Sequence, residues 1–411
     1  MLYHICLGRY IMTYERKYLV ACAAVAIGES IAMNGTGYCE LWPLTAAITV
    51  ITVFFGFGFV LPGWGVAAIF FGAMTIAFAS TCSNHQISRE KFWMKDRAQF
   101  HSRVHNRSSS TGALRAELSR RAGIGLEHSP DFANLNRAIL LGERHRVPRS
   151  TKQIFIGAGT MHIFAISGLH VMVIAIMLRT LTKMLFVPLR IAGVLSLPAL
   201  WLYVAIVGYP PSAVRAAIMA SIHFSSAIFL RRPNAIISWA LTFLIVHLHS
   251  PALIADAGCL LSFSITLAII LSARHAAECG GIRSAITISA AAWLAGTPIA
   301  AHFFGRITLG GLLANLFLMP MASANVVLGA LGILTSFLNG WTSRHLNNLS
   351  AATAAAMKGL SAAISMLPGA NLEIEKWTFA DCLLFYVCAG TIICAVCRMK
   401  SRQNWLRRCR A

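Results

Sequence analysis

The sequence predicts an all-α polytopic membrane protein with about 11–12 hydrophobic helices, some of them broken or re-entrant, and a small basic soluble insertion. Hydrophobic residues make up 57% of the 411 residues and charged residues only 12%, whereas a soluble globular protein has about 25% charged residues. Apolar runs close to the length of about 20 residues that spans a bilayer recur along most of the chain. These observations exclude a soluble fold.

The charge of the chain predicts an anionic partner. The 35 basic and 14 acidic residues give a net charge of +21. Basic loops on the cytoplasmic side of a membrane protein account for part of this excess. The remainder indicates contact with nucleic acid or with lipid headgroups.

The cysteines predict neither a metal site nor a disulfide framework. The 11 cysteines follow no metal-ligand spacing, and several lie inside apolar runs, where cysteine behaves as a small hydrophobic residue. We therefore expect no cofactor and no metal.

Residues 1–80 are predicted to form N-terminal transmembrane helices, because apolar runs cover 18–33, 41–61 and 63–80. The first run is the least secure of the three, since it is short and contains Glu29. Basic residues precede it, but no small-residue cleavage site follows. A first membrane helix is therefore favoured over a cleaved signal peptide.

Residues 81–135 are predicted to form a short basic soluble segment, which could be a reduced OB-like domain. Arginine and lysine are dense from 81 to 153, and strand patterning there is weak. Three preceding spans would deliver the segment to the outside of the cell, and long segments can be translocated despite positive charge. A cytoplasmic basic loop is the alternative.

A membrane domain is predicted over 136–397, followed by a basic cytoplasmic tail at 398–411. Every second loop between its apolar runs is basic, as expected if the 81–153 segment lies outside. The predicted runs cover 162–187, 191–208, 213–230, 234–250, 254–273, 284–304, 307–320, 322–339, 349–367 and 380–397.

One of these runs is predicted to be re-entrant. Ile307–Met319 is too short to cross a bilayer alone and contains two glycines and Asn315. If it dips in and returns, the basic tail ends in the cytoplasm, as the positive-inside rule favours.

The strongest local signal is a polar, glycine-containing break within Gly157–Arg179. Ser167, Gly168 and His170 interrupt an otherwise apolar run. Glycine is weak inside a helix, and an unwound turn in a membrane must face protein or water. We expect a broken helix here that lines or hinges a pore. The alternative is that Gly168 packs against a neighbouring helix while its polar neighbours bond locally.

Further candidates for a transport path carry polar groups near helix ends. Arg215 would either snorkel to the interface or face a water-filled path. Asp256 fits a helix cap as well as a functional acid. His302 and Arg306 would share a helix face if their helix continues that far. Asn315 belongs to the predicted re-entrant run.

Several segments resemble the membrane domain of the ComEC family, the inner-membrane channel of bacterial DNA uptake. The resemblance begins at Gly159–His170, which includes His162, and continues in the family's order. The other segments are Asn136–Arg144, Gly208–Met219, Ala255–Thr266 and Pro298–Pro320. The resemblance implies a channel in the bacterial inner membrane that passes single-stranded DNA into the cytoplasm. Its candidate path or hinge residues here are His162, Ser167, Gly168, His170, Arg215, Asp256, His302, Arg306 and Asn315.

The chain departs from the fuller family pattern. Residues 81–135 look too short for an intact OB-like domain, and no His-x-His-x-Asp-His cluster of a metallo-β-lactamase-like domain occurs. We therefore expect a short form that is not an enzyme. No phosphate-binding Gly-x-x-x-x-Gly-Lys-Ser/Thr loop occurs either. The resemblance then implies a separate ATP-driven motor in the cytoplasm and a periplasmic DNA-binding protein. Whether the channel is a homo-oligomer is left open.

Two other functions fit parts of the sequence. Ala165–Gly168 is close to the Gly-x-Ser-Gly of rhomboid proteases, which would make Ser167 a nucleophile, although alanine replaces the first glycine. A secondary transporter of a small anion would also use broken helices and interior arginine.

Overall fold

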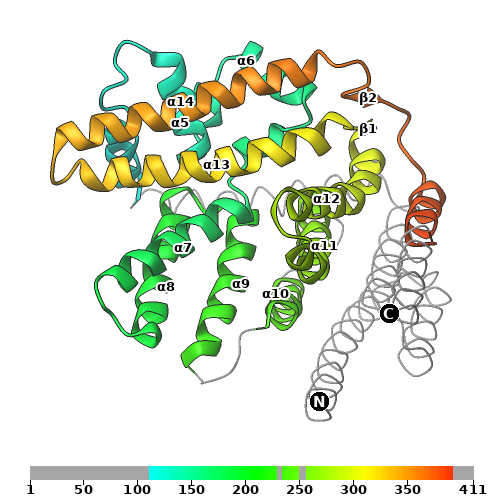
Figure 1. The fold of residues 1–411 in the computed structure, drawn as a ribbon, viewed down its shortest axis with the longest axis horizontal. Coiled ribbons are helices and arrows are strands. Elements are labelled where there is room, and N and C mark those ends of the chain that lie inside the picture. Colours follow the sequence, from blue (N-terminus) through cyan, green and yellow to red (C-terminus); the bar gives the residue numbers. More distant parts are fainter. Residues whose placement is uncertain (1–110, 229–233, 250–255, 392–411) are drawn as a thin grey trace, which may run out of the picture. The chain divides into compact units, whose positions relative to one another are not determined.

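A computed structural model of the protein describes residues 111–228, 234–249 and 256–391 (Figure 1). The predicted spans within 1–80, the basic segment before residue 111 and the tail at 398–411 lie outside these residues. The described chain is mainly helical, which confirms the predicted fold class. It divides into two compact units, described separately below. Of the described residues, those within 243–306 and 373–391 belong to unit 1, and those within 111–242 and 307–372 belong to unit 2.

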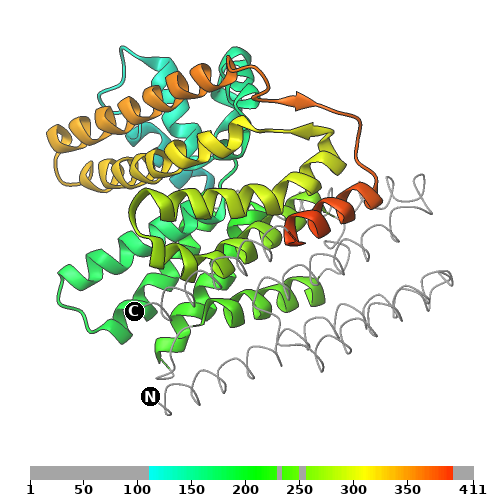
Figure 2. The same cartoon turned by 45° about the vertical axis from the view of Figure 1, so that its right-hand side comes forward.

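Unit 2 is a helical bundle in which two long helices pack on several shorter ones (Figure 2). A helix at 111–121 precedes its labelled elements. These are α5 (Pro130–Leu141), η2 (Arg144–Arg146), α6 (Arg149–Gly157), η3 (Met161–Phe164), α7 (Gly168–Met184), α8 (Leu189–Ile206), α9 (Pro211–Ile228), α13 (Gly310–Thr335) and α14 (Gly340–Ser365). The described part of the basic segment is therefore built of helices and turns.

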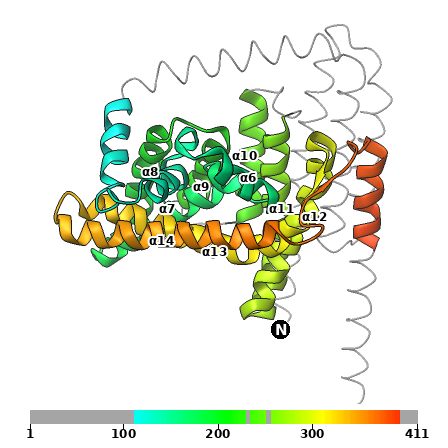
Figure 3. The same cartoon turned by 90° about the horizontal axis from the view of Figure 1, so that it is seen from above.

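The helices α13 and α14 form a hairpin along one side of unit 2, and α5 and α6 pack against it (Figure 3). Leu318, Ala322 and Val326 of α13 are almost fully buried. On α14, Asn339 caps the N-terminus by accepting a hydrogen bond from the Trp341 backbone N–H at 2.9 Å. The hairpin supplies one wall of the unit 2 core.

The re-entrant prediction for Ile307–Met319 is wrong. The helix α13 continues to Thr335 and joins the predicted runs 307–320 and 322–339 into one element of 26 residues. Pro320 lies inside this helix without ending it. A proline removes one backbone donor, but packing by neighbouring helices lets membrane helices tolerate that loss. The predicted run 349–367 is likewise only part of α14, which begins at Gly340.

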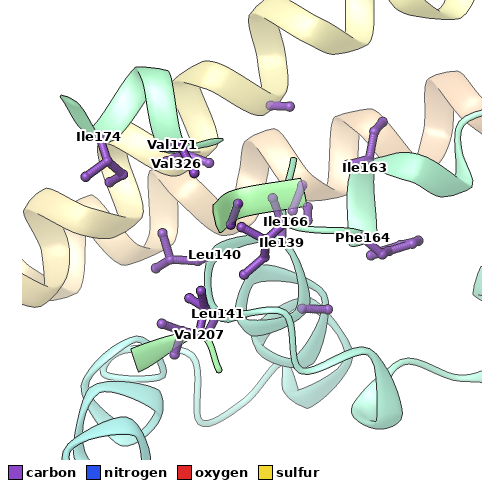
Figure 4. Packing of buried hydrophobic residues seen from close by; sticks show 14 of the residues in the cluster. Ile139, Leu140, Leu141, Ile163, Phe164, Ile166, Val171, Ile174, Val207 and Val326 are labelled. Atoms are coloured by element: carbon purple, nitrogen blue, oxygen red, sulfur yellow. The ribbon is translucent and has the colours of Figure 1, made fainter. Parts of the chain in front are cut away.

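The core of unit 2 is apolar and closely packed (Figure 4). Ile139 and Leu140 of α5 are at most 1% exposed, as is Phe164 of η3. Phe155 and Phe164 pack edge to face, with ring centroids 4.7 Å apart. This core holds the short helices around the break that the sequence predicted.

Unit 1 is centred on a pair of long packed helices, α11 (Ala257–Cys279) and α12 (Gly281–Phe304). A further helix at 379–391 packs on α12, where Tyr386 donates to the Ala295 carbonyl at 2.8 Å. The helix α10 (Ala235–His249) has residues in both units. The short strands β1 (Arg306–Ile307) and β2 (Leu372–Glu373) pair with each other.

Three helices are long and apolar enough to cross a membrane among the described residues: α11, α12 and α13. Shorter apolar helices include residues of α8 and α10 and the helix that follows Thr378. These helices support a multi-pass membrane protein. The helix α14 has 26 residues but is not among the candidate spans.

Candidate functional site

The predicted helix break is present in unit 2. The helix α6 ends at Gly157, the short η3 follows, and α7 begins only at Gly168. Gly159 has φ of 73°, a left-handed conformation that favours glycine. A Cβ at this position would lie 2.6 Å from Cβ of Thr308. Glycine is therefore needed here for both conformation and space.

Ser167 and His170 form the N-terminal cap of α7. The Ser167 backbone N–H donates to Nδ1 of His170 at 3.3 Å, and the Ser167 hydroxyl lies 3.1 Å from the same nitrogen. This is the geometry of a capping box, with histidine in the place usually held by Glu or Gln. His170 lies in the first turn of α7 rather than in the unwound segment, and is only 1% exposed.

The helix α9 closes the other side of the break. The Ser212 hydroxyl donates to the Ile166 carbonyl at 2.6 Å, so a side chain satisfies backbone in the non-helical segment. A Cβ on Gly168 would lie 3.6 Å from Cβ of Ala216, an ordinary contact. Gly168 is therefore not required by close packing. Arg215 is 6% exposed, so it is buried in unit 2 and does not snorkel outward.

His162 and Asn315 meet on the η3 side of the break. His162 is exposed, and it lies beside the Asn315 side chain of α13. Asn315 is partly buried. Six of the nine predicted site residues belong to unit 2: His162, Ser167, Gly168, His170, Arg215 and Asn315.

The other three candidates, Asp256, His302 and Arg306, belong to unit 1. Asp256 caps α11 by accepting a hydrogen bond from the Cys259 backbone N–H at 3.0 Å. The simpler of its two readings, a helix cap, therefore accounts for its position.

His302 and Arg306 do not share a helix face. The helix α12 ends at Phe304, and Gly305 adopts a left-handed conformation that turns the chain into β1. Nδ1 of His302 lies 2.8 Å from the Trp377 carbonyl. Arg306 donates to the Glu373 carboxylate at 2.7 Å. Both residues therefore contact the segment that leads into the last described helix.

The described residues contain no cluster of three or more potential metal ligands. The site is thus built from backbone, hydroxyl, imidazole, amide and guanidinium groups.

Comparison with known proteins assigns the family. The Competence protein family matches residues 139–399, more than half of the chain, including the break, α9 and α13. The chain belongs to this family. The match agrees with the resemblance carried by the Ser-Gly-Leu-His segment.

The relatives that match the chain are distant. The chain is 28% identical over 207 residues to "ComE operon protein 3" of Bacillus subtilis (strain 168), which covers 50% of this chain and 27% of that protein. It is 29% identical over 202 residues to an uncharacterized protein of Aquifex aeolicus (strain VF5), which covers 49% of this chain and 47% of the relative. The matches therefore span less than half of either relative. No solved structure matches the chain.

Sequence reasoning missed a polar network in the core of unit 2. Asn136 of α5, Asn325 of α13 and Ser350 of α14 are all fully buried. Asn325 donates to the Ser350 carbonyl at 2.7 Å, and the Ser350 hydroxyl donates to Asn136 Oδ1 at 2.7 Å. The available signal was Asn325 inside an apolar run, which predicts an interhelical hydrogen bond.

Proposed function

We propose that this protein forms the inner-membrane conduit for incoming single-stranded DNA during natural transformation. The observation that carries the proposal is the helix break ahead of Ser167, inside the region matched by the Competence protein family. Broken helices direct backbone groups and helix dipoles toward the membrane interior and commonly build transport paths. The net charge of +21 suits a polyanionic substrate.

The proposal assigns candidate roles to the polar residues at the break. His162 and Asn315 would border the strand, because they lie beside each other and His162 is exposed. Ser167 and His170 would fix the start of α7 rather than contact the strand, because His170 is buried. The driving force would come from a separate ATP-driven motor, with DNA delivered by a periplasmic binding protein.

Transformation frequency tests the proposal. Deleting the gene in a competent host with no second copy should abolish transformation and leave DNA binding at the cell surface intact. Complementation with the intact gene should restore it. Unchanged transformation in the deletion strain would reject the conduit.

A serine hydrolase is favoured by one observation, the 3.1 Å distance between the Ser167 hydroxyl and Nδ1 of His170. The same nitrogen accepts the Ser167 backbone N–H, so the cap explains the distance without catalysis. A Ser167→Ala variant separates the two functions. Full transformation activity in this variant would exclude Ser167 as a catalytic nucleophile. Loss of activity, together with labelling of wild-type Ser167 by a fluorophosphonate, would support a hydrolase.

A transporter of a small anion is the other alternative. Purified protein that carries DNA should bind single-stranded oligonucleotides, with an affinity that falls steeply as salt rises. Absence of such binding would favour the small-anion transporter.

A further inference from the structure

Arginine side chains of unit 2 gather around the buried carboxylate of Glu143. Glu143 is 5% exposed and lies between α5 and η2. Its Oε2 accepts from the Ser119 hydroxyl at 3.0 Å and pairs with Arg146 Nε at 2.6 Å. Its Oε1 lies 4.0 Å from Nε of Arg115. Both oxygens of this acid therefore face cations or a donor.

A third arginine joins the same group. Arg137 Nε donates to the Ser119 carbonyl at 2.9 Å, and Arg137 interacts electrostatically with both Arg146 and Glu143. Burial, reinforced by the positive charge of Arg146, lowers the pKa of the Arg137 guanidinium. We name Arg115, Arg137 and Arg146 the arginine cluster.

The arginine cluster carries more positive charge than its one carboxylate balances. Three guanidiniums share Glu143. Each guanidinium has five N–H donors, and the hydrogen bonds within the described residues use few of them. The side chains of Arg115 and Arg146 are 31% and 44% exposed. Unused donors therefore stay accessible to a ligand.

The arginine cluster lies next to the helix break. Arg115 donates to the Leu141 carbonyl at 3.0 Å, and Leu141 and Ile166 both belong to the core cluster shown in Figure 4. A Cβ on Gly142, the residue before Glu143, would lie 3.0 Å from Ile166. Ile166 is the residue immediately before the Ser167 cap. The residue before Glu143 therefore lies against the residue before the cap of α7.

We infer that the arginine cluster is a binding site for backbone phosphates of single-stranded DNA at the approach to the helix break. The forked guanidinium matches a phosphate in shape and charge and binds it with paired hydrogen bonds. Arginines from three separate elements converge here around one carboxylate, that of Glu143. The inference rests on the proposed conduit, and a phospholipid headgroup is the alternative source of phosphate that the experiment must distinguish.

The experiment measures binding of a labelled oligo(dT) strand to the full chain in nanodiscs of zwitterionic lipid, by fluorescence anisotropy over a range of salt concentrations. The test variant is Arg137→Gln with Arg146→Gln. The matched control is Arg120→Gln with Arg144→Gln, because these arginines are exposed and do not contact Glu143 in the described residues. A variant with Arg137→Lys and Arg146→Lys keeps the charge and controls for folding, with thermal unfolding measured for every variant.

The test variant should bind roughly tenfold more weakly at low salt, and the slope of log affinity against log salt should shrink by about 1.4, because each contact to a single strand contributes about 0.7. The control pair should keep the wild-type slope. Glu143→Gln should change binding in the opposite direction, with a steeper slope, because it removes the only acid of the group. A purely structural cluster would not strengthen binding when its acid is removed.

Three results would overturn the inference. The folded test variant could keep the wild-type salt dependence of oligo(dT) binding. The control pair could lose as much oligo(dT) affinity as the test pair. In a second set of nanodiscs that contain phosphatidylglycerol, the test variant could also lose association with this anionic lipid while keeping oligo(dT) binding, which would assign the cluster to lipid. In each case, oligo(dT) binding by the wild-type protein would still support the proposed conduit, and only the arginine cluster would be rejected as the binding site. If wild-type protein fails to bind oligo(dT) at all, the proposed function fails first.

Discussion

The backbone N–H of Ser167 donates a hydrogen bond to Nδ1 of His170, three residues further along the chain, at 3.3 Å. This bond satisfies a donor that the first turn of a helix otherwise leaves without a partner. It fixes where α7 starts, and so where the non-helical segment before it ends. The position of the break is therefore set by local chemistry.

Replacing His170 tests the cap. His170→Ala should lower the free energy of unfolding by about 2–4 kcal/mol, because it removes both the cap acceptor and a buried side chain. His170→Gln should cost less, since glutamine serves the same capping position. Thermal unfolding in detergent measures both. Equal loss in the two variants would mean that packing alone holds this histidine.

Two glycines in the break region should respond differently to alanine. Gly159→Ala should destabilise the protein by about 2 kcal/mol or more. Alanine would have to adopt a left-handed backbone conformation here, and its Cβ would collide with Thr308. Gly168→Ala should change stability by less than about 1 kcal/mol. Gly359→Ala is the control, since a Cβ there meets no atom within 4 Å in the described structure. A large loss at Gly168 would contradict the packing described above.

Removing the buried amide of Asn325 should destabilise unit 2. Asn325→Ala leaves Ser350 and Asn136 short of a hydrogen-bond partner. Each buried polar group that loses its partner costs about 1–3 kcal/mol. Adding Asn136→Ala should cost less than the sum of the single changes, because the residues belong to one network. Asn348→Ala on the exposed face of α14 should stay within about 0.5 kcal/mol of wild type. Strict additivity in the Asn136–Asn325 cycle would argue against the network.

The pair between Arg306 and Glu373 should matter little for stability. Their side chains are 41% and 73% exposed, and exposed pairs contribute about 0–1 kcal/mol. If Arg306 borders the conduit, Arg306→Gln should lower transformation while the unfolding temperature stays close to wild type. Glu373→Gln is the matched control and should leave transformation unchanged. Equal transformation frequencies in both variants would show that Arg306 does not border the conduit.

The sequence predicted those features that depend on local chemistry. Ser167 and Gly168 predicted a break in a helix, and Asp256 fitted a helix cap as well as a functional acid; the structure places helix N-termini at both positions. Reasoning from local rules failed at Pro320, because those rules place a helix end near a proline. In the structure α13 packs against α14 and α5 and continues past Pro320.

Contacts between distant residues could not be read from the sequence. Arg306 and Glu373 are 67 residues apart, and Asn136 and Asn325 are 189 residues apart. Nothing in the composition of one segment specifies its partner. The arginine cluster shows the same limit, since basic residues dense along 81–153 predicted an anionic ligand but not which of them gather around Glu143.

The separation of Asn136 from Asn325 has a consequence for biosynthesis. At about 5–20 residues per second, a ribosome needs roughly 10–40 s to make the intervening chain. During that interval the amide of Asn136 has emerged, while α13 and α14, which later enclose it, have not. The nascent helix α5 must therefore wait in water, against the insertion machinery or beside a chaperone until its partners arrive.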